Sequence, residues 1–160
     1  MLIRLRRGSI AEGLALIGLV ALTLALYLWR LDSNRYANPL QSAAVLAGSG
    51  DWTAFLFGSM DGGNAITHDK PPAGCWTMIL SVKLFGFSPW SILIPQALMG
   101  VATVATLYLS LRRVAPWPAA LLGGTLLALT PVSALVFRYN QPDAQMIMLM
   151  TLATAATLRG

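Results

Sequence analysis

The sequence predicts an all-α membrane protein: a partial helical bundle of about four spans, with juxtamembrane surface helices in the first outer loop. Hydrophobic residues make up 56% of the 160-residue chain and charged residues only 11%. An average soluble domain has about 45–50% apolar and about 25% charged residues, so this chain has too little charge to cover a globular surface. The second observation is a set of nearly charge-free segments, because a membrane-spanning helix needs about 20 mainly apolar residues.

The predicted spans follow these apolar segments and make the chain a single transmembrane region. They are residues 11–30, 88–111, 115–137 and 143–158. The second and third are long enough to cross the hydrocarbon core, the first reaches that length with its flanks, and the fourth is short. Residues 71–87 are apolar but short and contain Lys83, so we expect a partial helix packed against protein. A cleaved signal peptide is the alternative for the first span, but Leu28-Trp29-Arg30 lacks the small residues of a cleavage site.

Basic residues at the span ends predict the orientation. Arg4, Arg6 and Arg7 precede the first span, Arg112 and Arg113 follow the second, and Arg159 follows the last. Because Lys and Arg near span ends concentrate on the cytoplasmic side, we expect a multi-pass protein of the cell membrane with a cytoplasmic N-terminus. Residues 32–70 then form an outer loop. The net charge of +5 is explained by this topology, so no nucleic-acid partner is expected.

Two short surface helices are expected in the outer loop. Asn38 is a good N-cap for the first, because Pro39 follows at the first helical position. Asp51 is the corresponding cap of the second, and the aromatic residues that follow it suit a membrane interface. These helices either form a lid or floor for a site at the bilayer surface or simply cover the mouth of the bundle; both readings stay open.

Segment 68–72 contains the densest polar cluster of the loop. His68, Asp69 and Lys70 precede two prolines, which fix φ and remove backbone donors. The residue before a proline is extended, and neighbouring side chains of an extended segment point in opposite directions. Asp69 and Lys70 are therefore free to meet separate substrate groups. The alternative reading is a charged loop before a proline-capped helix.

Segment 138–143 forms a second cluster at the outer end of the third span. It contains Arg138, Asn140 and, after a proline, Asp143. The helix dipole favours a carboxylate in the first turn of a helix, which alone would explain Asp143. A carboxylate at the membrane edge is nevertheless costly unless it is paired or used. Because the predicted topology places segments 68–72 and 138–143 on the same side, together they predict a site for phosphate and hydroxyl groups.

The order of these motifs resembles a known family. An outer loop with Asn38-Pro39 precedes Asp69-Lys70-Pro71-Pro72, and Asn140-Gln141-Pro142-Asp143 comes later. This arrangement resembles the amino-terminal part of the family C multi-spanning glycosyltransferases, in particular the protein O-mannosyltransferase and aminoarabinose transferase group of the bacterial glycosyltransferase family 39 type. The resemblance implies a hexosyl- or pentosyltransferase that takes a sugar from a polyprenyl-phosphate donor at the outer membrane face. The acceptor would be a hydroxyl or phosphate of a protein, lipid or glycan.

The resemblance also implies roles for individual residues. Asp69 and Asp143 match the family's carboxylates and are the expected catalytic residues. Asn38, Lys70, Arg138 and Asn140 are the expected substrate-binding residues. Some relatives bind a divalent metal ion, for which Asp69 is the expected ligand. The family's usual loop carboxylate corresponds to Asn38, an amide that cannot act as a general base. Either another carboxylate is the base, or Asn38 only positions the acceptor.

The family's enzymes have many more spans than this chain, so we expect a fragment, a truncated reading frame or a split gene product. Two other functions are considered. A non-catalytic truncated membrane subunit, or a remnant of such an enzyme, agrees with the short chain and with the amide at Asn38. A transporter-like module is disfavoured because none of the four apolar segments carries a charge at mid-depth.

Overall fold

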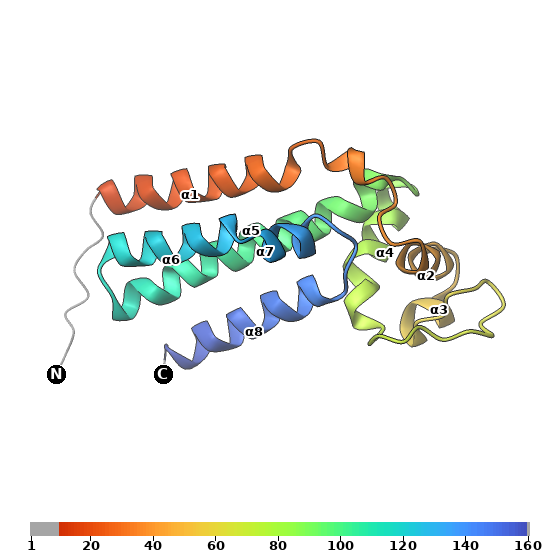
Figure 1. The fold of residues 1–160 in the computed structure, drawn as a ribbon. Coiled ribbons are helices and arrows are strands. Elements are labelled where there is room, and N and C mark those ends of the chain that lie inside the picture. Colours follow the sequence, from red (N-terminus) through yellow and green to blue (C-terminus); the bar gives the residue numbers. More distant parts are fainter. Residues whose placement is uncertain (1–9, 160) are drawn as a thin grey trace.

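The computed structural model describes residues 10–159, in which every regular element is helical. The elements are α1 (Ile10–Leu28), the 3₁₀ helix η1 (Leu31–Asn34), α2 (Pro39–Gly50), α3 (Trp52–Phe57), α4 (Ala73–Phe85), α5 (Pro89–Val114), α6 (Trp117–Leu129), α7 (Pro131–Phe137) and α8 (Asp143–Thr157). Figure 1 shows a bundle of long helices with a lobe of short helices at one end. The all-α membrane fold predicted from composition is confirmed.

α5 is the central helix of the bundle and packs against α1, α6 and α8. Ser88 begins it as a side-chain cap, its hydroxyl oxygen accepting from the Ser91 N–H, and Pro89 occupies the first helical position. Gly100 lies where α5 meets α1 and α7, because a β-carbon there would come within 2.5 Å of Phe137 and 2.6 Å of Tyr27. The rings of Tyr27 and Phe137 stack with centroids 5.8 Å apart and are buried. This contact joins three helices in the core.

Two helices are long and apolar enough to cross a membrane: α1 with its η1 extension, and α5. They correspond to the predicted spans 11–30 and 88–111. The predicted span 115–137 is broken into α6 and α7, which are bent by 64° and count as a third span only if they are taken together. Pro131 explains the break, because proline lacks the N–H that would continue the α6 hydrogen bonds. The predicted span 143–158 forms α8, whose 15 residues are fewer than a full crossing needs, so this span stays a prediction.

The lobe consists of α2, α3 and α4. Asn38 caps α2 and Asp51 caps α3, each accepting a backbone N–H as predicted. α4 has 13 residues and lies across the end of the bundle in Figure 1, rather than along the spans. Lys83 of α4 holds its ammonium 4.1 Å from the centroid of the Trp52 ring, which ties α4 to the start of α3. The short apolar segment is therefore part of the lobe.

The opposite end of the bundle is joined by an ion pair between α1 and α5. Arg112 in the last turn of α5 lies 2.8 Å from the carboxylate of Glu12 in the first turn of α1. The Tyr108 hydroxyl also donates to the Glu12 carbonyl. Because these contacts join the start of α1 to the end of α5, the two helices are antiparallel, as the predicted membrane topology requires. Arg4, Arg6 and Arg7, on which the predicted orientation also rests, lie outside the described residues.

Replacing Gly100 with alanine should destabilise the bundle, because the added β-carbon meets two rigid aromatic rings. We expect the free energy of unfolding to fall by about 1–3 kcal/mol, as is usual for an overpacked core. Thermal unfolding in detergent measures this change. Gly18→Ala is the matched control, since nothing lies within 4 Å of its β-carbon position. Equal stability of the two variants would show that α1, α5 and α7 do not pack through Gly100.

Candidate functional site

Segments 68–72 and 138–143 meet where α4 and α8 begin. A β-carbon on Gly74 would lie 2.5 Å from the Pro142 ring, so the first turn of α4 approaches the start of α8 closely. This approach is possible only because glycine has no side chain. It brings Lys70, just before α4, beside Asp143, the first residue of α8.

Lys70 and Asp143 line one pocket of about 270 Å³. The remaining lining residues are mainly apolar and come from the start of α4 and the first half of α8, with the residues just before each helix: Pro71, Ala73, Gly74, Pro142, Gln145, Met146, Leu149 and Met150. Gln145 also has a buried side-chain oxygen that lacks a hydrogen-bond partner among the described residues. The pocket thus combines one cation and one carboxylate with a long apolar wall, a combination that suits an amphiphilic ligand with a phosphate head.

The apolar wall of the pocket is a feature that the sequence reading missed. Met146, Leu149 and Met150 line the pocket together, because their spacing places them on one face of α8. Counting that helical spacing forward from Asp143 is the signal that would have identified the wall.

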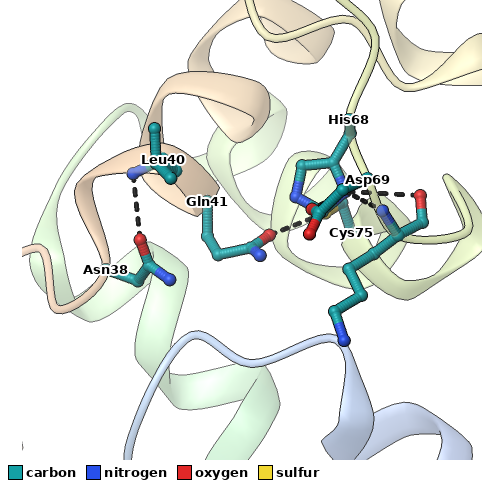
Figure 2. A network of polar contacts seen from close by, with 7 residues as sticks. Asn38, Leu40, Gln41, His68, Asp69 and Cys75 are labelled. Carbon is teal, nitrogen blue, oxygen red and sulfur yellow. Dashed lines mark hydrogen bonds and ion pairs between the residues drawn. The ribbon is translucent and has the colours of Figure 1, made fainter.

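His68 organises the segment that carries Lys70. Its side chain is only 1% exposed, whereas that of Asp69 is 82% exposed. The His68 Nδ1 accepts a 2.9 Å hydrogen bond from the Lys70 backbone N–H, so the ring N–H lies on Nε2, which is buried without a partner among the described residues. In Figure 2, His68, Asp69 and Cys75 lie on one side of the cluster and Asn38 on the other. Burial of His68 therefore fixes the turn, while Asp69 stays accessible.

Hydrogen bonds from the side chain of Asn140 join the turn before α8 to the segment that contains Asn38. The Asn38 side chain accepts from the Leu40 N–H as the cap of α2, and its backbone N–H donates to Asn140 Oδ1 at 2.7 Å. Asn140 is completely buried, and its amide nitrogen contacts the carbonyls of Tyr36 and Asn38 and the hydroxyl of Ser42 at 2.9–3.1 Å. The side chain of Asn140 thus holds the outer loop, and its predicted substrate role stays a prediction.

Arg138 also makes hydrogen bonds within the protein. Its guanidinium donates to the carbonyls of Leu26 at 3.1 Å and Trp29 at 2.6 Å, at the end of α1. The last carbonyls of a helix lack partners and carry partial negative charge, which a cation stabilises. Asn34 donates in turn to the Arg138 carbonyl. The guanidinium of Arg138 therefore holds the end of α1, and its predicted binding of a substrate phosphate stays a prediction.

The described residues do not form a site that fits a divalent metal ion. No group of three or more His, Cys, Asp or Glu side chains lies close enough together in residues 10–159 to hold one. Asp69 has His68 Nδ1 at 3.7 Å, but that nitrogen already accepts the Lys70 N–H. The metal role of Asp69 stays a prediction.

Comparison with known proteins assigns the chain to a family. The family described as Dolichyl-phosphate-mannose-protein mannosyltransferase matches residues 69–160, more than half of the chain, beginning at Asp69 and including the whole pocket. The chain belongs to this family. The predicted resemblance to family C glycosyltransferases is therefore confirmed.

Two curated relatives come from Bacillus subtilis strain 168. "Putative mannosyltransferase YkcB" is 34% identical over 142 residues, covering 88% of this chain and 19% of YkcB. "Putative mannosyltransferase YycA" is 34% identical over 147 residues, covering 91% of this chain and 21% of YycA. The chain thus spans about a fifth of the length of these relatives. No solved structure matches it.

Replacing Asn140 with alanine should loosen the outer loop. The change leaves the Asn38 N–H and the carbonyls of Tyr36 and Asn38 without their partner. An unsatisfied buried polar group costs about 1–3 kcal/mol, so residues 36–42 should become sensitive to limited proteolysis. Ser49→Ala is the control, because the Ser49 hydroxyl contacts only the Leu46 carbonyl within α2. Equal cleavage of both variants would contradict the holding role of Asn140.

Replacing His68 with alanine should release the Lys70 amide. We expect hydrogen exchange in the peptide around residues 66–76 to be about fivefold faster, as for loss of one hydrogen bond. His68→Asn should preserve slow exchange, because its side-chain oxygen can take the place of Nδ1 as acceptor. Deuterium uptake followed by mass spectrometry makes the comparison. Unchanged uptake in the alanine variant would show that His68 does not fix the turn.

Proposed function

We propose that this chain forms the part of a membrane glycosyltransferase that holds a sugar donor carried on polyprenyl phosphate. The single observation behind the proposal is that Lys70 and Asp143, which are far apart in sequence, line one pocket with an apolar wall. A polyprenyl-phosphate sugar has an anionic head and a long apolar chain. The ammonium of Lys70 is suited to the phosphate, and the face of α8 formed by Met146, Leu149 and Met150 is suited to the first prenyl units.

The family supports this choice of donor. Its description names dolichyl-phosphate mannose, which is a sugar on a polyprenyl phosphate, and both curated relatives carry a mannosyltransferase name. We propose the corresponding reaction at the outer face of the cell membrane, in a multi-pass protein with a cytoplasmic N-terminus. The acceptor would be a hydroxyl or phosphate of a protein, lipid or glycan.

The proposed transfer, written for a hydroxyl acceptor, uses Asp143 and Lys70 in different roles. The acceptor oxygen attacks the anomeric carbon of the sugar, and the bond from that carbon to the phosphate oxygen breaks. The polyprenyl phosphate leaves with the bonding electrons, and Lys70 stabilises its negative charge. Asp143 takes the proton of the acceptor hydroxyl. Asp69 is exposed at the same end of the bundle and is the second carboxylate that an acceptor arriving from solvent can meet.

Asp143→Asn and Lys70→Gln in the intact protein test this proposal. Loss of a general base should lower the transfer rate by about 10²–10⁴-fold, and loss of one charge-stabilising donor by about 10²–10³-fold. The assay follows transfer of labelled sugar from a polyprenyl-phosphate donor in membranes that express equal amounts of each variant. Lys83→Gln is the matched control, because this lysine contacts Trp52 away from the pocket. Transfer by Asp143→Asn and Lys70→Gln equal to that of the control would refute the assignment.

A further inference from the structure

A second groove, lined by both polar and apolar residues, lies between α5 and α8 at the end of the bundle opposite the lobe. It has a volume of about 130 Å³. Its lining residues are Thr106, Leu109, Ser110 and Arg113 of α5, with Leu152, Ala155, Ala156 and Arg159 from α8 and the residues that follow it. Figure 1 shows α5 and α8 ending at this side, away from α2, α3 and α4. The groove is therefore separate from the pocket of Lys70 and Asp143.

The two walls of this groove have the same pattern. The four lining positions on α5 are spaced i, i+3, i+4 and i+7, and so are the four on the α8 side. This spacing places each set in one stripe along its helix, and each stripe ends in an arginine, Arg113 or Arg159. Ala155 and Ala156 have small side chains. The α8 side of the groove therefore leaves room for a group of phosphate size to approach both Arg113 and Arg159.

The arginines of this groove differ from their neighbour Arg112. Arg112 pairs with Glu12 and donates to the Ala115 carbonyl, so its guanidinium is used within the bundle. Among the described residues, neither Arg113 nor Arg159 has an ion pair or a side-chain hydrogen bond. Two unpaired planar guanidiniums that share one groove are suited to a phosphate, to which each can donate two parallel hydrogen bonds.

We propose that this groove binds a phosphate group, carried by an anionic phospholipid or present as free phosphate. Basic pockets between spans at the cytoplasmic side are typical lipid headgroup sites. Leu109 and Leu152 line the same groove and are about half exposed, so an acyl chain can lie along them while the head meets Arg113 and Arg159. The site does not depend on the proposed sugar transfer, because it shares no residue with that pocket.

Native mass spectrometry of the intact protein in detergent tests the proposal, with phosphatidylglycerol as probe and phosphatidylcholine as the zwitterionic comparison. The wild type should retain phosphatidylglycerol preferentially. Each arginine near a membrane surface contributes about fivefold in affinity for anionic lipid, so Arg113→Gln combined with Arg159→Gln should weaken retention by about 25-fold. Arg35→Gln removes one positive charge in the segment between η1 and α2 and should leave retention unchanged. Equal retention by the double variant and the wild type would overturn the proposal.

A variant that fills the groove without changing any charge distinguishes lipid binding in the groove from two other causes of retention. These are general attraction to positive charge and a change of membrane topology. Ala156→Leu fills the groove and leaves every charge in place, so it should also lose phosphatidylglycerol. Ala153→Leu adds the same atoms on an exposed face of α8 outside the groove and should bind as the wild type does. Unchanged retention in Ala156→Leu would refute a site in this groove.

A competition arm identifies the source of the phosphate. Inorganic phosphate that displaces phosphatidylglycerol from the wild type would identify free phosphate as sufficient. Retention of the lipid in excess inorganic phosphate would assign the site to the lipid headgroup with its chain.

Discussion

The buried amide of Asn140 is the interaction on which the geometry of the candidate site depends. It joins the turn before α8 to the segment before α2 through hydrogen bonds to Asn38, Tyr36 and Ser42. Arg138, two residues earlier, anchors the same turn to the end of α1. With the turn held from both sides, Pro142 lies against Gly74, and the two charged groups of the pocket come together.

The carbonyls at the end of α1 explain why Arg138 contacts the backbone. The last carbonyls of a helix have no partner within the helix and need donors from elsewhere. A guanidinium with several donors satisfies two carbonyls at once and complements the helix dipole. These two bonds use two of the five N–H donors of Arg138. The cation of the pocket is Lys70, whose side chain has no hydrogen bond or ion pair among the described residues.

Local chemistry was readable from the sequence, whereas the long-range contacts were not. Composition predicts the helical bundle, and the caps Asn38 and Asp51 follow from rules that involve neighbours within three residues. The partners of Arg138 and Asn140 are about a hundred residues away, so no local pattern distinguishes them from substrate-binding groups. The bend between α6 and α7 was signalled by Pro131, but its 64° angle depends on packing.

Because Asn38 carries an amide, the general base of the proposed transfer must be another carboxylate. An aspartate would cap α2 equally well, so the cap alone does not require an amide. Asp51 and Asp61 are weak candidates for a base: the hydrogen bond from the Asn64 side chain lowers the pKa of Asp51, and the Ile66 backbone N–H lowers the pKa of Asp61. Both carboxylates already accept hydrogen bonds within the outer loop. Of the two carboxylates in the motifs of the family, Asp69 and Asp143, only Asp143 lines the pocket with Lys70.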